Sequence, residues 1–133
     1  MPGPIRTLIA DDEGVIREGL RAFLELDRRI EIIGEAINGQ QAIQMAIRHQ
    51  PDILILDSDL SDITGTEVVR QIHATFPTVR VICLAHMANP EPSDVACAIP
   101  HVSIVLSRST TSHQLLESIH CVMNSKACSA IAH

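Results

Sequence analysis

A run of apolar residues that ends in a carboxylate constrains the fold of this chain more than any other stretch. Residues 53–56 (ILIL) are continuously apolar, and Asp57 follows them directly. A short strand without polar alternation is typical of a parallel sheet that is covered on both faces. In an open α/β sheet, ligands bind beyond the carboxyl ends of the strands, and Asp57 stands at such an end. The sequence therefore predicts a buried central strand whose last side chain belongs to a functional site.

Apolar, strand-like stretches alternate with segments of helical periodicity along the chain. Alternation of this kind requires right-handed crossovers and a parallel sheet with helices on both faces. We therefore predict an α/β doubly wound fold with a five-stranded parallel sheet and five helices. The expected strands are residues 5–10, 30–36, 53–57, 79–84 and 102–106, and the expected helices are residues 15–26, 40–49, 67–75, 93–99 and 111–123.

The length of 133 residues and the apolar fraction of 46% suffice for one domain with a core of its own. We expect this domain to span residues 1–124, and residues 125–133 to form a C-terminal tail or the start of an interdomain linker. No apolar run approaches the roughly 20 residues of a membrane span, and the N-terminus lacks the pattern of a signal peptide. The four cysteines form no C-x-x-C pair, so reduced thiols are expected. These features predict a cytoplasmic location and no membrane partner.

The composition argues against nucleic-acid binding by this chain alone. Phe23 and Phe76 are the only aromatic residues, so bases would find no stacking surface. The net charge is −6 and the chain has no basic run, so it lacks the positive surface that binds a phosphate backbone. We therefore expect no direct nucleic-acid contact by this chain alone.

Three acids are expected to meet at one edge of the sheet. Asp11 and Asp12 follow the first expected strand, and Asp57 ends the third. Carboxylates that converge in one crevice repel one another unless a cation compensates their charge. Mg²⁺ suits a site with a few carboxylates, retained waters and a phosphate oxygen. A carboxylate beside Mg²⁺ can also act as a nucleophile and form an acyl-phosphate.

Several short motifs occur in order along the chain. They are LIADDE at residues 8–13, Asp57 with Gly65 eight positions later, and VICL at residues 81–84. Together they resemble the receiver domain of bacterial two-component response regulators, over roughly residues 5–124. VIREGL at residues 15–20 and GEAING at residues 34–39 are similar, more specifically, to the NarL/FixJ (LuxR-type) subfamily.

The resemblance implies a flavodoxin-like and CheY-like sheet with strand order 2-1-3-4-5, and a site that accepts a phosphoryl group. Asp57 would be the phosphoacceptor, and a sensor histidine kinase would be the donor. Asp12 and Asp57 would bind the cofactor Mg²⁺ directly, and Asp11 would bind it largely through water. The backbone carbonyl of Asp59 would complete the protein ligands, which implies no role for its side chain.

The resemblance also implies a regulatory output, and no enzymatic activity beyond phosphorylation and dephosphorylation of the domain itself. Phosphorylation would control dimerisation or an effector that regulates transcription. A second copy of the chain or another partner would bind a contact surface on residues 93–99, 102–106 and 111–123.

Several positions depart from the receiver pattern. Ala85 stands where receivers have Thr or Ser after the fourth strand, Ser107 stands where they have Lys, and Ile104 replaces a switch aromatic. Arg108, next to Ser107, is the candidate replacement for the phosphate contact. Leu-Ser at residues 60–61 replaces the usual Met-Pro after the acceptor. The nucleophile and the metal ligands are therefore intact, whereas the readout of the phosphate is depleted.

Two alternatives to a phosphorylation switch remain open. A degenerate receiver would act as a protein-interaction module without phosphorylation. A haloacid-dehalogenase-type phosphatase is the more distant alternative, because Asp57-Ser-Asp59 matches its D-x-D pattern. That class needs a later lysine, and the only lysine of this chain is Lys126.

Overall fold

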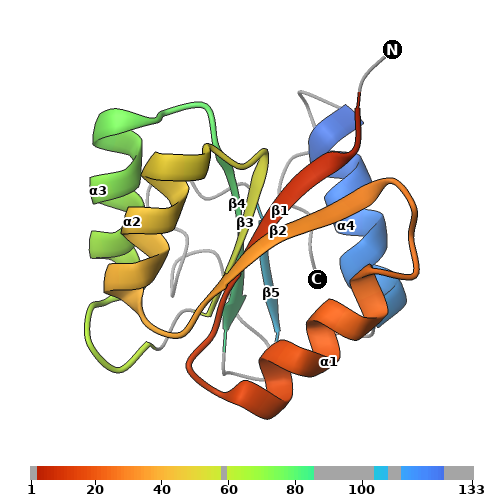
Figure 1. Cartoon of the computed structure of the whole chain (residues 1–133), viewed down its shortest axis with the longest axis horizontal. Coiled ribbons are helices and arrows are strands. Elements are labelled where there is room, and N and C mark those ends of the chain that lie inside the picture. Colours follow the sequence, from red (N-terminus) through yellow and green to blue (C-terminus); the bar gives the residue numbers. More distant parts are fainter. Residues whose placement is uncertain (1–2, 58–59, 86–103, 108–111, 125–133) are drawn as a thin grey trace.

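A computed structural model describes residues 3–57, 60–85, 104–107 and 112–124 of the chain. Within these residues, five strands form one parallel sheet in the order β2-β1-β3-β4-β5, with two helices on each face (Figure 1). The strands are β1 (Ile5–Ala10), β2 (Ile30–Ala36), β3 (Ile53–Asp57), β4 (Arg80–Ala85) and β5 (Ile104–Ser107), and the helices are α1 (Gly14–Leu24), α2 (Gly39–His49), α3 (Gly65–Thr75) and α4 (Ser112–Asn124).

The parallel pairing and the strand order confirm the predicted doubly wound sheet. The helix expected at residues 93–99 lies outside the described residues, so the prediction of five helices is not tested. The helix expected at residues 111–123 is α4. Among the described residues, no helix has the length and the apolar character that a bilayer crossing requires.

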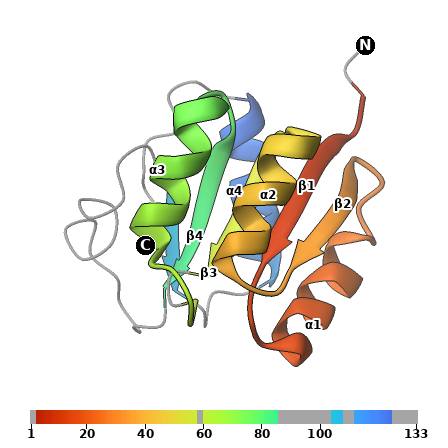
Figure 2. The same cartoon turned by 60° about the vertical axis from the view of Figure 1, so that its left-hand side comes forward.

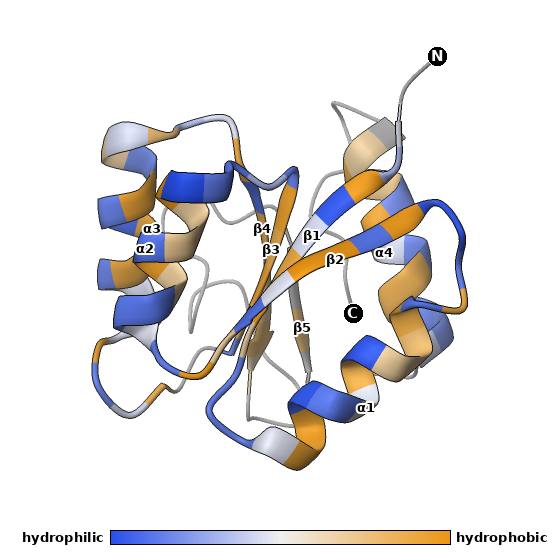
Figure 3. Cartoon of the chain, in the orientation of Figure 1, coloured by the Kyte–Doolittle hydropathy of each residue, from blue (hydrophilic) through white to orange (hydrophobic). Residues whose placement is uncertain are grey.

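The central strand β3 is buried on both faces, as its unbroken apolar sequence predicts. Leu54 and Leu56 belong to the hydrophobic cluster under α2 and α3, whereas Ile53 and Ile55 belong to the cluster under α1 and α4. Successive side chains of a strand point to opposite faces, so one strand contributes to both cores. Figure 2 shows α2 and α3 on their side of the sheet, and Figure 3 shows that the helices carry both apolar and polar residues.

Several element boundaries differ by one or two residues from those expected; α3, for example, begins at Gly65 and not at residue 67. The helix α1 ends at Leu24 and not at Leu26, because the following amides bond to carbonyls three residues back: Leu26 N–H donates to Phe23 O and Asp27 N–H to Leu24 O, both at 3.1 Å. At the other end of the sheet, β4 and β5 are extended by one pair, Ala85 opposite Ser107. This additional pair lies at the edge where the acids are expected.

The described cysteines differ in state. Cys83 is a free thiol buried in β4. Cys121 is disulfide-bonded. The expectation that all four thiols are reduced is therefore wrong for Cys121.

Truncation of a β3 side chain tests how far the fold depends on this strand. Leu54→Ala removes a fully buried side chain, and we expect it to lower the free energy of unfolding by about 2–5 kcal/mol. Leu26→Ala removes the same atoms from a side chain that is 79% exposed, and it should change that free energy by less than about 0.5 kcal/mol. Urea unfolding measures both variants, and equal losses would contradict a central position for β3.

Candidate functional site

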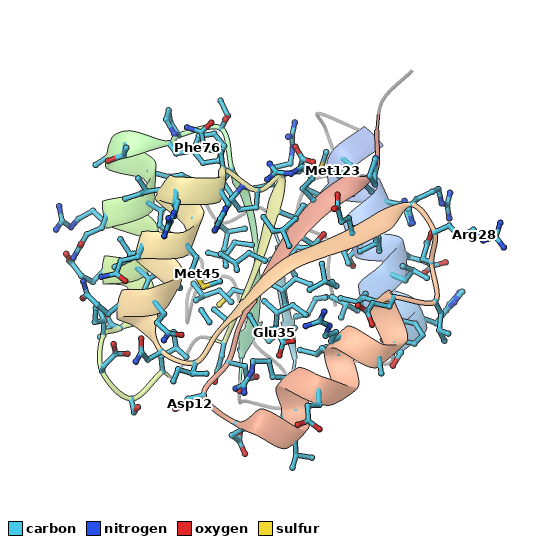
Figure 4. All side chains as sticks on the ribbon, in the orientation of Figure 1. Asp12, Arg28, Glu35, Met45, Phe76 and Met123 are labelled. Carbon is cyan, nitrogen blue, oxygen red and sulfur yellow. The ribbon has the colours of Figure 1, made fainter. Side chains whose placement is uncertain are left out.

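The acids expected to converge do so at the carboxyl ends of β1 and β3. These strands pair in parallel with Ala10 opposite Leu56, so Asp11 and Asp57 leave the sheet at the same level. One carboxylate oxygen from each of Asp11, Asp12 and Asp57 lies within 4.8 Å of the others. Figure 4 labels Asp12 in the turn between β1 and α1. The structure therefore brings together residues that are up to 46 positions apart in the sequence.

The members of this acid cluster differ in their contact with solvent. Asp11 and Asp57 are each 1% exposed, whereas Asp12 is exposed. Burial disfavours ionised carboxylates, and so does their mutual repulsion. The donor set consists of carboxylate oxygens without sulfur or imidazole nitrogen, which is the set that a hard divalent cation prefers. The described residues of the cluster therefore fit Mg²⁺.

The thiol of Cys83 does not contribute a nucleophile near this site. Burial is the main cause that raises the pKa of Cys83 to about 12, and repulsion from the Asp57 carboxylate adds to it. At neutral pH the thiol is protonated, and the thiolate is the reactive form. Nucleophilic chemistry at this edge therefore falls to the carboxylates.

The turn that carries Asp11 is held by its own backbone and by a cation from α1. Asp11 N–H donates to Ala36 O at 3.1 Å, and Glu13 N–H donates to Asp11 Oδ1 at 2.8 Å. Arg17 Nη1 donates to the carbonyl oxygen of Asp11 at 2.8 Å. Arg17 also pairs through Nε with Glu35 Oε1 at 3.1 Å, and both side chains are mostly buried. The guanidinium therefore connects the turn after β1 to the last part of β2.

Glu35, which is labelled in Figure 4, forms ion pairs with both Arg17 and Arg21. Arg21 donates to Glu35 as well, and also to Glu25 at 3.1 Å. The Arg21 guanidinium is the main cause that holds the pKa of Glu35 below its usual range, and Arg17 acts in the same direction. The sequence indicates no partner for Arg17. Only the tertiary structure shows that it reaches the backbone of Asp11.

The structure places the departing positions at the same edge of the sheet. Ala85 ends β4 and is 1% exposed, and its neighbour in the register is Ser107 at the end of β5. Asp57 pairs with Leu84, so Ala85 is one residue beyond the level of Asp57. Ile104 begins β5, three residues before this edge. Asp59 and Arg108 lie outside the described residues.

The family model of the response regulator receiver domain matches residues 7–120 of this chain. The chain belongs to this family. The match agrees with the motifs after β1 and β3 and with the acid cluster that they form. It does not support the phosphatase alternative.

Curated relatives support the subfamily as well. The transcriptional regulatory protein LiaR of Bacillus subtilis is 36% identical over 87 residues, which are 65% of this chain and 41% of that protein. The response regulator protein VraR of Staphylococcus saprophyticus is 26% identical over 125 residues, which are 93% of this chain and 59% of that protein. The chain thus spans about two to three fifths of the length of these relatives. They place it in the NarL/FixJ subfamily, as the motifs indicated.

A solved receiver domain has the same fold over almost the whole chain. The receiver domain of the response regulator NarL from Mycobacterium tuberculosis superposes with a TM-score of 0.82 at 25% identity, and the match covers 93% of this chain and 100% of that one. Receiver domains also occur in enzymes, since a protein-glutamate methylesterase of Nocardioides is 40% identical over 89 residues, 24% of its length. The receiver itself is therefore a signalling module that different outputs share.

Removal of the Arg17 guanidinium tests its contact with the turn after β1. We expect Arg17→Gln to lower the free energy of unfolding by about 1.5–3 kcal/mol, because it removes a charge-assisted bond to a backbone carbonyl and a mostly buried ion pair. Arg21→Gln is the matched control, since it removes the same charge from the same Glu35 partner without a bond to Asp11. Its side chain is 44% exposed, so solvent screens its ion pairs and the loss should be clearly smaller than that of Arg17→Gln.

The pH dependence of the difference in unfolding free energy between wild type and Arg17→Gln provides a second measurement. Because the pKa of Glu35 is lowered in the folded state, its stabilising contribution is present above the unfolded-state value of 4.5. That contribution is lost as the pH falls through the lower folded-state pKa. Urea unfolding at pH 7 and in acid should therefore show a smaller gap between wild type and Arg17→Gln in acid. A gap that widens in acid would contradict the assigned ion pair.

Proposed function

We propose that this chain is a phosphorylation-accepting receiver whose acceptor is Asp57, with a sensor histidine kinase as the donor. The observation that carries the proposal is the buried carboxylate of Asp57, within 4.8 Å of carboxylate oxygens of Asp11 and Asp12 at the end of the central strands. Membership of the receiver family supports the same conclusion. We also propose a cytoplasmic location, where such a kinase presents its phosphorylated histidine.

The reaction needs little more from the protein than position and charge. A carboxylate oxygen of Asp57 attacks the phosphorus, a P–O bond forms, and the P–N bond to the donor imidazole breaks, with its electron pair going to nitrogen. When bound, Mg²⁺ neutralises negative charge on the phosphoryl oxygens. Asp12 and Asp57 would hold this ion directly, Asp11 largely through water, and the backbone carbonyl of Asp59 would be the remaining protein ligand.

A beryllofluoride titration with Mg²⁺ tests this function. Wild type should form a saturable adduct that shifts backbone amide resonances around β3, and acetyl phosphate should add one phosphoryl group that hydroxylamine removes. Asp57→Asn should abolish both reactions, since an amide is not a nucleophile of this kind. The matched control is Asp52→Asn, because Asp52 lies at the opposite end of β3 and accepts from Arg6 N–H at 2.9 Å. A phosphoryl group on the Asp57→Asn variant would refute the assignment of the acceptor.

The degenerate receiver stays a second candidate, and a specific observation favours it. The buried Ala85 ends β4 beside the acid cluster, where a hydroxyl would otherwise donate to a phosphoryl oxygen. A charge-assisted hydrogen bond of this kind contributes about 1.5–3 kcal/mol. A loss of this size equals the whole difference between two conformations that are a few kcal/mol apart. Under this candidate, either no adduct forms, or the adduct forms but hardly changes the rest of the domain.

Restoration of the hydroxyl separates the two candidates. Ala85→Ser adds one donor at small cost in volume. If the missing hydroxyl limits the readout, beryllofluoride should shift amides of α4 in Ala85→Ser and leave those of wild type nearly unchanged. The change at β3 should be similar in both proteins. Equal shifts of α4 in the two proteins would instead show that the adduct is read without this hydroxyl, with Ser107 or Arg108 as the remaining candidate contacts.

The output we propose is the control of dimerisation or of a transcriptional effector. LiaR is described as a transcriptional regulatory protein, and this chain matches less than half of its length. Residues 1–124 would form the receiver, and residues 125–133 would be a tail or the start of a linker. The contact surface would include β5 with Ile104, together with α4. DNA binding would belong to an effector domain and not to these residues.

A further inference from the structure

The connection between β3 and α3 contains a carboxylate that bonds to another element of the fold. Asp62 Oδ1 accepts from the backbone N–H of Gly39 at 2.8 Å, and Asp62 Oδ2 accepts from the backbone N–H of Gln40 at 3.0 Å. Both amides belong to the first turn of α2. Asp62 is not a member of the acid cluster. Its two bonds therefore join the segment after the acceptor to the N-terminus of a different helix.

The first turn of α2 suits an anionic partner. The first amides of a helix have no partner within the helix, and its dipole places partial positive charge at this end. The N-cap residue Asn38 accepts from Gln41 N–H at 2.8 Å, and Asp62 accepts from the two preceding amides. The bond from Gly39 is the main cause that lowers the pKa of Asp62 below its usual range. The carboxylate is therefore ionised at neutral pH.

The absence of a side chain at Gly39 permits this close contact. A Cβ atom at this position would lie 3.0 Å from Val68 Cγ2, 3.1 Å from Ile63 Cβ and 3.2 Å from Asp62 Oδ1. Such distances are tighter than ordinary van der Waals contact. The backbone at the start of α2 is thus packed directly against the segment that leads from the acceptor into α3.

This contact matters for the acceptor because only four residues separate Asp57 from Asp62. The acceptor loop is the segment between β3 and α3, of which the structure describes residues 60–64; the first residue of α3, Gly65, follows them. Leu60 anchors it on the apolar side, being 7% exposed. The loop contains no proline, so no ring restricts its backbone. The bonds of Asp62 to α2 and the burial of Leu60 therefore hold residues 60–64 close to the acceptor.

We propose that Asp62 is a positioning residue that anchors residues 60–64 of the acceptor loop to the N-terminus of α2 and thereby supports the binding of Mg²⁺ beside Asp57. The part that concerns Mg²⁺ rests on the proposed function, whereas the anchoring itself does not. Asp62 contacts neither metal nor phosphoryl group in this role. It acts through the backbone that it holds in place.

The first measurement is amide hydrogen exchange in the metal-free protein. Asp62→Ala should speed exchange of the Gly39 and Gln40 amides and of residues 60–64 by roughly tenfold, because it removes two bonds to an ionised acceptor. Asp62→Asn keeps one acceptor oxygen and should give a smaller increase. The matched control is Asn38→Ala, which removes a bond from the same helix end but none of those that Asp62 makes. It should speed exchange at Gln41 and leave residues 60–64 unchanged.

The second measurement is the Mg²⁺ affinity of the same variants, followed by amide shifts during a titration. Asp62→Ala should weaken Mg²⁺ binding several-fold, Asp62→Asn should weaken it less, and Asn38→Ala should leave it at the wild-type value. Unchanged exchange of residues 60–64 in both Asp62 variants would overturn the anchor. Faster exchange with unchanged Mg²⁺ affinity would overturn the positioning role.

These outcomes differ from a failure of the proposed function. If wild type itself bound neither Mg²⁺ nor beryllofluoride, the function would fail, and the exchange measurement would still decide whether Asp62 anchors the loop. If Asp62→Ala does not fold, both measurements are made on Asp62→Asn, because that variant keeps the size of the side chain and one acceptor oxygen. An effect of Asn38→Ala on residues 60–64 equal to that of Asp62→Ala would count against the anchor, since it would reflect only the stability of α2.

Discussion

Parallel pairing of β1 with β3 places two carboxylates side by side, and the surrounding structure keeps them there. Ala10 lies opposite Leu56, so Asp11 and Asp57 leave the sheet at the same level, each 1% exposed. Ionised carboxylates so close together and so far from water carry a free-energy cost of desolvation and repulsion. A hard cation would offset this cost. The same cation would also neutralise negative charge on the oxygens of a transferred phosphoryl group. The chemistry proposed for this domain follows from that single register.

The turn after β1 and the segment after β3, which adjoin the acid cluster, are held by the same kind of contact. On one side Arg17, paired with Glu35 of β2, donates to the carbonyl of Asp11. On the other side the Asp62 carboxylate accepts from the Gly39 amide of α2. In both cases an ionised side chain bonds to the backbone of a neighbouring element.

The site is divided between strands that differ in their fit to the receiver family. The strands β1 and β3 lead into the proposed acceptor and the proposed acid ligands, Asp11, Asp12 and Asp57, which match the receiver pattern. The additional pair at the end of β4 and β5, Ala85 with Ser107, brings no long cationic side chain to this edge. Acceptance of a phosphoryl group and response to it are separate steps, because the first needs the acid cluster and the second needs donors that differ between two conformations. This chain retains the first set more completely than the second.

The sequence by itself determined the class of fold, the strand order through the family resemblance, and the three acids that meet at one edge. The fold class and the acids follow from local pattern. An unbroken apolar strand such as residues 53–56 is stable only where both faces are buried, and the residue that follows it then lies at the carboxyl end of the sheet. The sequence pattern did not predict that α1 ends at Leu24, because Leu26 continues the apolar spacing but lies outside the helix. Only the tertiary structure decided the roles of Arg17 and Asp62. Their partners are backbone groups of other elements, and a backbone amide or carbonyl is the same in every sequence, so no residue pattern marks it.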